Sequence, residues 1–447
     1  MSIDFTYFEA LQKRACQELE AGTHINVTLA GEKSQFIRIN GARIRQIGTV
    51  EDASLELSLF LETPRGIRKG SSSFSLTGMS GVDFQRVDQT LASLRTEVPL
   101  LPVDPYAKLP ENSGSSRQEK KGSLLPTDQA AETILRTIQG LDLVGIYSAG
   151  TSFRAMANSA GLSHWFSTEN FSLDYSLYTP NQKAIKGTFA GNHWSDERFA
   201  AEIGSAKRQL PLLERPPRKI ARGQYRTYLA PAAVQDLLSM FSWEGISEAA
   251  IRQGSSPFQK LRSGERTFSA KLNVQENFAQ NEIPRFNDQG ELAPEVFSLI
   301  ENGQLKNTLI SSRSSKEYGL TANGANESEM MRAVWVSPGN LKEAEILKQL
   351  GTGLYLSNLH YLNWSDQTAG RITGMTRYAC FWVENGELVS PIENMRWDES
   401  LFSLFGENLI DFTDSLTFIP EVMTYEARQL GGAWVPGALI SSVNFTI

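Results

Sequence analysis

Apolar and polar residues alternate around three Asn-Gly pairs, and this is the clearest pattern in the chain. In 297–306 and 380–389, an apolar run is followed by Glu-Asn-Gly and a second strand-like run, and 36–45 is a looser copy around Asn40 and Gly41. Asn-Gly tolerates the two positive φ angles of a type I′ turn, so each segment predicts a tight β-hairpin. We therefore expect antiparallel sheet to be a main component of the protein.

Helical and strand-like periodicities alternate in the N-terminal half. Apolar residues recur at helical spacing near 6–20 and 82–95, from about 128, and near 195–208. Strands are expected at 24–29, 35–39, 43–47, 55–61, 141–147, 153–158, 164–169 and 171–178. Antiparallel strands bounded by helices predict an α+β layer for this half.

Two segments divide the chain. Residues 111–123 contain no apolar side chain, which predicts a flexible surface loop. Residues 211–218 include the pair Pro216 and Pro217, which cannot continue a helix or donate to a sheet, and they predict a linker. We therefore expect an N-terminal domain at 1–212 and a C-terminal domain at 213–447.

The second half is expected to be mainly β. It opens with a strand at 223–229 and a helix that begins at Pro231, and beyond residue 265 it contains mostly short strand-like runs and glycine turns. Many short strands at this spacing predict a barrel-like or strongly curved sheet. The predicted fold class is thus α+β, with an N-terminal α/β-layer domain and a C-terminal, mainly antiparallel, barrel-like β domain.

Composition narrows the class of protein. A chain of 447 residues with 40% hydrophobic residues fits a folded protein of two domains. The formal charge of -7 argues against general nucleic-acid binding, and no apolar stretch is long enough for a membrane helix. Only Cys16 and Cys380 occur, which excludes a disulfide framework, and the N-terminus lacks a secretory signal pattern. The cytoplasm is the expected location.

Short motifs of the second half follow one another in a set order, and a further motif lies at 154–161. They occupy 230–238, 254–258 with 264–265, 286–290, 299–303, 311–319 with 321–324, 337–339, 353–356, 363–374 and the hairpin at 380–389. In this order they resemble the TldD/PmbA family, metallopeptidase-related proteins once described as modulators of DNA gyrase. Asn287 and Gln289 depart from the F-D-D-E-G turn of that family.

The family has a zinc-bearing TldD-like kind and a metal-free TldE-like or PmbA-like kind. In the zinc-bearing kind, His-Glu-x-x-x-His lies on the helix after the first strand of the C-terminal domain, and a cysteine lies near the C-terminus. Two imidazoles on one helical face can bind zinc, with the Glu as general base. Here 230–241 and 243–251 contain no histidine, and 425–437 contains no cysteine. The resemblance implies a metal-free subunit without catalytic residues, with zinc only in a partner.

The resemblance also implies an assembly. A TldE-like subunit pairs with a zinc-bearing TldD-like subunit, and the pair encloses a cavity where unfolded peptide is held as an added strand. We expect this chain to dimerise through its C-terminal domain, with itself or with such a partner, as a non-catalytic subunit that helps to hold peptide for proteolysis. The alternatives are a stand-alone peptide-binding or scaffold protein of the same fold, and an enzyme with a different nucleophile.

Candidate residues for a peptide cleft precede the second hairpin of the C-terminal half. In the family, the loop and strand there line the shared cavity, and polar groups among aromatic ones suit a cleft that binds both backbone amides and varied side chains. The alternative is that these polar side chains only satisfy turns. The candidates are Asn358, His360, Asn363, Thr368 and Arg371.

Other reactive side chains are isolated in the sequence. Cys380 lies in the apolar run 378–383, where a free cysteine is expected to be a core residue. His193 precedes a predicted helix and is expected to help form the turn. The chain has no Gly-x-Ser-x-Gly elbow and no Gly-rich phosphate loop, so a serine hydrolase or a nucleotide-binding enzyme is not indicated.

Overall fold

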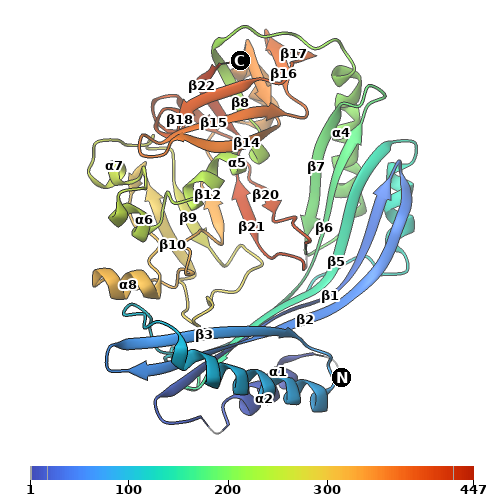
Figure 1. The fold of residues 1–447 in the computed structure, drawn as a ribbon. Coiled ribbons are helices and arrows are strands. Elements are labelled where there is room, and N and C mark those ends of the chain that lie inside the picture. Colours follow the sequence, from blue (N-terminus) through green and yellow to red (C-terminus); the bar gives the residue numbers. More distant parts are fainter. Residues whose placement is uncertain (1–2, 18, 426, 447) are drawn as a thin grey trace.

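A computed structural model describes residues 3–17, 19–425 and 427–446. A long curved sheet forms most of the N-terminal half, and the C-terminal half lies along its concave side (Figure 1). No helix within the described ranges is long and apolar enough to cross a membrane.

The N-terminal sheet has seven strands, in the order β3-β2-β1-β5-β6-β4, with β7 also paired to β6. All neighbours are antiparallel except β4 and β6, which run parallel. The strands are β1 (Thr23–Asn40), β2 (Arg43–Thr63), β3 (Gly66–Ser75), β4 (Ser115–Lys120), β5 (Asp142–Asn158), β6 (Ser163–Tyr178) and β7 (Ala184–Gly191). The helices are α1 (Phe5–Ala15), α2 (Ser80–Glu97), α3 (Ala130–Ile138) and α4 (Asp196–Leu213).

Each pair of short strands expected in this half is one long strand. Strand β1 contains both 24–29 and 35–39, and β5, which begins at Asp142, merges the strands expected at 141–147 and 153–158. Strands β2 and β6 likewise merge their expected pairs. The intervening residues look like loops in the sequence because the outer face of the sheet is uncovered there. In β1, for example, Lys33 on that face is exposed to solvent.

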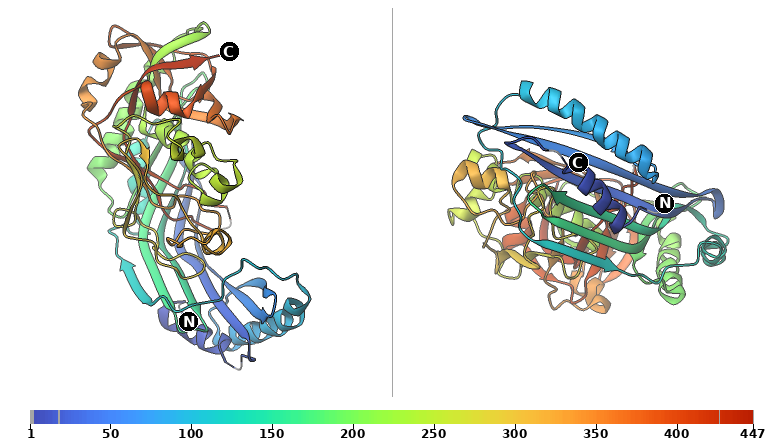
Figure 2. Two further views of the ribbon diagram at one scale, coloured as in Figure 1. Left: turned by 90° about the vertical axis from the view of Figure 1, so that its left-hand side faces the viewer. Right: turned by 90° about the horizontal axis from the view of Figure 1, so that it is seen from below.

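Two separate cores cover the outer face of the sheet. Helices α1 and α2 pack on one end, against Ile25, Val27 and Leu29 of β1. Helices α3 and α4 pack on the other end, against Ile37 and Ile39 of the same strand. Figures 1 and 2 show the two helix pairs at opposite ends of the long strands. All five of these β1 residues have odd numbers, so they share one face of the strand.

The segment 111–123 was expected to be a flexible loop, and this expectation is wrong for its centre. Residues 115–120 form β4, which pairs with residues 163–168 of β6. The segment lacks apolar residues because β4 lies at the edge of the sheet, where most of its side chains are exposed. Polar and charged side chains are typical of edge strands, because they discourage pairing with other chains.

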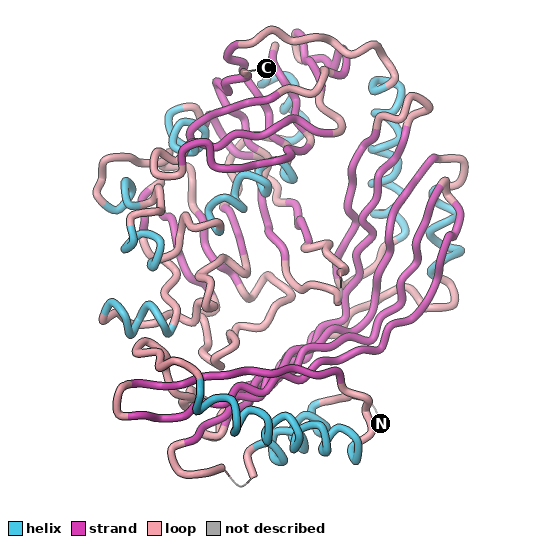
Figure 3. Tube along the Cα trace, in the orientation of Figure 1, coloured by secondary structure: helices cyan, strands magenta, loops and turns pink. Residues whose placement is uncertain are grey.

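The C-terminal half contains two open sheets, which are mostly antiparallel (Figure 3). The six-stranded sheet has the order β11-β10-β9-β12-β21-β20. The nine-stranded sheet has the order β14-β15-β18-β22-β8-β13-β16-β17, with β19 also paired to β22. Neither sheet closes on itself within the described residues, so the α+β class is confirmed and the barrel-like form is not.

The elements of this half are mostly short. Its strands are β8 (Gly223–Leu229), β9 (Val274–Asn277), β10 (Val296–Glu301), β11 (Gln304–Leu305), β12 (Val334–Val336), β13 (Gly353–Leu356), β14 (Asn358–Asp366), β15 (Arg371–Arg377), β16 (Phe381–Glu384), β17 (Glu387–Pro391), β18 (Arg396–Ser400), β19 (Leu409–Phe412), β20 (Thr417–Pro420), β21 (Gly432–Val435) and β22 (Ala438–Phe445). Its helices are α5 (Pro231–Ser242), α6 (Glu248–Gln253), α7 (Gln259–Arg262), α8 (Ser312–Tyr318) and α9 (Ile346–Leu350). Helix α4 extends past the predicted start of the linker and includes Pro211, and the division into domains at 212 and 213 stays a prediction.

Two of the three predicted hairpins have their turn at the expected Asn-Gly pair. Both residues of each pair have positive φ, at 50° and 75° for Asn302 and Gly303 and at 52° and 81° for Asn385 and Gly386. The third turn is shifted by one residue.

In the third hairpin, the loop residues are Gly41 and Ala42, with φ of 59° and 52°, and Asn40 pairs with Arg43. This register places Ile39 opposite Ile44, and both side chains then contact the core under α3 and α4. Core burial thus selects the register here over the turn preference of Asn-Gly.

Candidate functional site

All five predicted cleft residues lie on the hairpin of β14 and β15, at one edge of the nine-stranded sheet. Asn358 pairs with Arg377 at the open end of the hairpin, and Thr368 lies in the turn at the other end. His360 and Asn363 lie between these two ends, on β14. The structure therefore gathers the candidates on one hairpin but spreads them along its length.

The contacts of these side chains differ. Thr368 donates to Asp366 Oδ1 at 3.1 Å within the turn, which fits a turn-forming role. Arg371 pairs with Asp398 of the neighbouring strand β18. Burial lowers the pKa of His360, and the positive charge of Arg377 lowers it further. His360 is therefore neutral at pH 7 and suited to hydrogen bonding.

Strand β14 has an irregularity between His360 and Asn363. The register with β15 shifts there, and Tyr361 adopts a positive φ of 52° with 75% of its surface exposed. Its ring lies 4.2 Å from the His360 ring, between centroids. Bulges of this kind redirect side chains at sheet edges. The result is an aromatic pair displayed beside the edge of the sheet.

Helix α5 borders β14. Asp236 of this helix accepts a hydrogen bond from the Leu359 backbone N–H at 2.9 Å, so it satisfies one outward-facing group of the edge strand. Burial raises the pKa of Asp236 to about 6, although the Leu359 N–H opposes the shift. Asp236 was not among the residues predicted from the sequence, although a lone acid among the apolar residues of the helix was a usable signal.

Replacing Asp236 with Asn is expected to stabilise the protein at pH 7 by about 2 kcal/mol. The pKa of the folded state, about 6, lies above the ordinary 3.8, so the folded state favours the protonated carboxyl. The stability from this protonation is full below about pH 4 and is lost as the pH rises through about 6. Each pKa unit is worth about 1.4 kcal/mol, reduced here by partial exposure to water. The Asn side chain keeps an acceptor for Leu359.

Urea unfolding of Asp236→Asn and of the original chain between about pH 4 and 7 measures this effect. Asp128→Asn, at an exposed position, is the matched control and is expected to leave the profile unchanged. Equal slopes of stability against pH in Asp236→Asn and the original chain would contradict the assignment.

Apolar residues fill the region where α5 meets the C-terminal tail. Helix α5 packs against β20 and β21. Leu237, Met240 and Phe241 of the helix share one core with Ala433 and Val435 of β21. Across the described part of the chain, no three His, Cys, Asp or Glu side chains are grouped so that they could hold a metal ion. The residues at this junction therefore do not provide the ligands that a zinc ion requires.

The isolated reactive residues have ordinary surroundings. Cys380 is buried in the core, as predicted, and burial raises the pKa of its thiol. Its Sγ lies 3.1 Å from the Arg377 carbonyl oxygen. His193 is hydrogen bonded to Asn192, its neighbour in the chain. Neither residue has the adjacent base or acid that an activated nucleophile requires.

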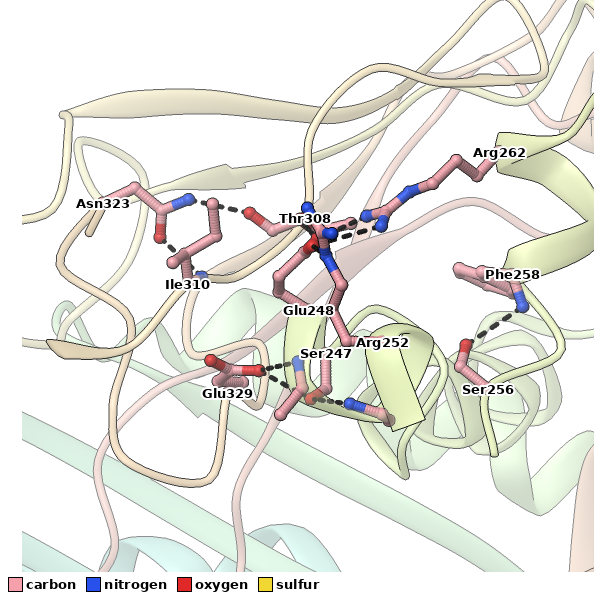
Figure 4. Close-up of polar contacts among 12 residues, drawn as sticks. Ser247, Glu248, Arg252, Ser256, Phe258, Arg262, Thr308, Ile310, Asn323 and Glu329 are labelled. Atoms are coloured by element: carbon pink, nitrogen blue, oxygen red, sulfur yellow. Dashed lines mark hydrogen bonds and ion pairs between the residues drawn. The ribbon is translucent and has the colours of Figure 1, made fainter. Parts of the chain in front are cut away.

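Glu248 and Glu329 are buried carboxylates near α6 (Figure 4). Glu329 accepts from the hydroxyls of Ser247 and Ser311 and from the backbone N–H groups of Ala249 and Ser311. Glu248 accepts from Arg252, Arg262 and Thr308. Carboxylates saturated in this way hold the local structure together and have no lone pair left for a ligand.

Comparison with known families identifies the C-terminal half. The model of the PmbA/TldA metallopeptidase C-terminal domain matches residues 222–447, just over half of the chain. No curated protein matches the chain.

Three solved structures have a similar fold. TldE from Thermococcus kodakarensis superposes with a TM-score of 0.78 at 14% identity, covering 98% of this chain and 99% of that one. A candidate modulator of DNA gyrase from Thermotoga maritima gives 0.74 at 14% identity, with 99% and 100% covered. Another from Bacteroides thetaiotaomicron gives 0.74 at 15% identity, with 99% and 98% covered. At these identities, the likeness concerns the fold alone.

Proposed function

Since this chain belongs to the TldD/PmbA family of metallopeptidase-related proteins, we propose that it is a non-catalytic subunit that helps to hold unfolded peptide for a zinc-bearing partner. The observation that carries this proposal is the apolar junction of α5 with β21. A zinc site there would need imidazole, thiolate or carboxylate ligands, and the chain supplies Leu237, Phe241 and Ala433 instead. The chemistry is then left to a partner, whose helix carries His-Glu-x-x-x-His.

Strand β14 supports the part of the proposal that concerns peptide. Among the described residues it is the terminal strand of its sheet and pairs with β15 alone, while helix α5 contacts it. Strand addition uses backbone hydrogen bonds, and it therefore tolerates many peptide sequences. His360 and Asn363 flank the bulge on this strand and would contact the side chains of an added peptide. Asp236 limits the available edge, because it already occupies the N–H of Leu359.

The proposed assembly is a dimer through the C-terminal half, with a zinc-bearing homologue or with a second copy of this chain. The two departures from the family turn, at Asn287 and Gln289, have structural roles in this chain. The Asn26 side-chain amide of β1 donates to Gln289 Oε1 at 3.3 Å. The Asn287 side chain donates to the Ala325 carbonyl oxygen at 2.7 Å. Gln289 therefore connects the two halves of this chain, and Asn287 ties two loops together within the C-terminal half.

Reconstitution with a zinc-bearing homologue tests the proposal. The chain alone is expected to contain no stoichiometric zinc and to leave an unfolded peptide intact, whereas the pair should form a complex and cleave it. The measurements are elemental analysis, light scattering after size-exclusion chromatography, and cleavage of the peptide. About one zinc per chain together with cleavage by the chain alone would overturn the proposal.

A double substitution separates the cleft from a structural role in the same experiment. His360→Ala with Asn363→Ala should leave the complex intact and slow cleavage, because the peptide loses contacts beside the edge of β14. His193→Ala, in the N-terminal half, is the control. Lower stability with unchanged activity per folded complex would show that the two residues only support the hairpin.

A further inference from the structure

A cavity of about 210 Å³ lies between the inner face of the N-terminal sheet and the C-terminal half. A single water needs only about 15 Å³ of such space, so there is room for a small molecule. Its apolar wall contains Met156, Ile283, Pro284, Phe286 and Leu430. Its polar lining contains Thr28, Arg154, Asn287, Asp288, Asn326, Arg332 and Gln429.

The two arginines of this lining have no direct ion pair. Within the described ranges, no carboxylate oxygen lies within 4.0 Å of the guanidinium of Arg154 or of Arg332. Burial lowers the pKa of both side chains, which reflects how poorly their charge is solvated. A largely buried charge without a direct counterion is costly, and groups perturbed in this way cluster at functional sites.

The guanidinium of Arg332 is hydrogen bonded to neutral carbonyl groups. It donates to the carbonyl oxygens of Arg285, Phe286 and Gly324, at 3.2, 3.0 and 2.9 Å. Its Nε has no partner. A guanidinium has five N–H donors, so these bonds leave donor capacity unused.

Arg154 is held in the same manner. It donates to the carbonyl oxygens of Phe153 at 2.8 Å, Arg428 at 3.3 Å and Gly31 at 3.4 Å. The last two distances are long for hydrogen bonds to a charged group. Both arginines of the cavity therefore contact main-chain dipoles and no anion.

The nearby carboxylates do not contact either guanidinium. Glu276 accepts from the backbone N–H of Arg332 at 2.6 Å, and Glu32 accepts from the backbone N–H of Arg428 at 2.9 Å. Asp288 lines the cavity and acts on Arg332 only through space. These acids moderate the positive potential of the cavity without neutralising either guanidinium by contact.

We propose that this cavity binds a small carboxylate with an apolar side chain, held by Arg154 and Arg332 and by the apolar wall. Guanidinium groups are the preferred protein partners of carboxylates, and few polar groups in an apolar pocket are typical of small-molecule sites. The ligand is either a free carboxylate of this kind or the C-terminal residue of a peptide. The site lies within this chain, so it does not depend on a partner or on the proposed role in proteolysis.

Titration calorimetry with N-acetyl-leucine and with its carboxamide tests the site, because the two molecules differ only in the charged group. The carboxylate is expected to bind, and the carboxamide to bind at least about tenfold more weakly. Arg332→Met should abolish binding. Thr28→Met should also abolish it by filling the cavity while both arginines remain. Arg43→Met, at an exposed hairpin position, is the matched control and should bind normally.

A short peptide ending in leucine, with a free or an amidated C-terminus, distinguishes the two sources. Tighter binding of the free peptide than of N-acetyl-leucine assigns the cavity to peptide ends, and equal or weaker binding assigns it to free carboxylates. If neither carboxylate binds, or if the amides or the Thr28→Met variant bind equally well, the proposal is wrong. Circular dichroism of each variant confirms that the chain is folded. If Arg332→Met does not fold, Thr28→Met still tests the proposal.

Discussion

Replacing Glu329 with Ala is expected to lower the free energy of unfolding by about 3–4 kcal/mol. Its carboxylate joins the first turns of two helices, since Ser247 and Ser311 are the N-cap residues of α6 and α8. Each serine hydroxyl donates to Glu329 and accepts from a backbone N–H of its own helix. The substitution leaves buried donors without an acceptor at both helix ends, and such donors are expensive.

Urea unfolding followed by tryptophan fluorescence measures this loss. Glu327→Ala is the control, because that side chain is two residues away and exposed. Glu329→Gln should lie between the two, since an amide keeps one acceptor oxygen but replaces the other with a donor. A change below about 1 kcal/mol in Glu329→Ala would show that water replaces the carboxylate, and that the cluster is less closed than its hydrogen bonds indicate.

Replacing Arg428 with Ala should cost about 3 kcal/mol and loosen the contact between the two halves. Arg428 lies in the loop between β20 and β21 and is buried against the inner face of the N-terminal sheet. Its guanidinium donates to Ser34 Oγ of β1 at 3.1 Å and to the Asn170 carbonyl of β6 at 3.1 Å. The Arg428 side chain thus bridges strands on both sides of β5.

Limited proteolysis reports this loosening directly. Met423 and Tyr425, in the same loop, are 54% and 86% exposed, so the loop is accessible to a protease once it is released from the sheet. Cleavage between β20 and β21 should therefore be faster in Arg428→Ala. Arg266→Ala removes an exposed arginine and serves as the control. Unchanged cleavage and unchanged stability would mean that Arg428 does not hold the loop in place.

The sequence predicted elements best where one local cause decides them. The turns at Asn302 and Asn385 follow from the tolerance of Asn-Gly for positive φ, and the helices of the N-terminal half follow from apolar spacing. The turn near Asn40 was displaced because burial of Ile39 and Ile44 outweighs that preference. Strand β4 was missed because an edge strand needs no apolar residues.

The candidate site was predictable only in part. The family motifs led to the hairpin of β14 and β15, but the role of Asp236 depends on a contact with Leu359, more than 100 residues away in the chain. The cavity beside Arg154 and Arg332 lies between segments that are further apart in the sequence. The pattern of residues within one segment cannot predict such contacts, because they form only when distant segments pack together.

The polar middle of β1 imposes a strict condition on the evolution of this protein. Residues 30–34 resemble a loop, and loops usually tolerate insertions. Here, however, Ile25, Val27 and Leu29 precede this stretch, and Ile37 and Ile39 follow it on the same face of one continuous strand. A single inserted residue would turn every later side chain to the opposite face, and it would expose one core while leaving the other intact. The number of residues in this stretch is therefore more constrained than their identity. The fold is compatible only with insertions of an even number of residues, which keep later side chains on the same face, or with insertions absorbed as a bulge.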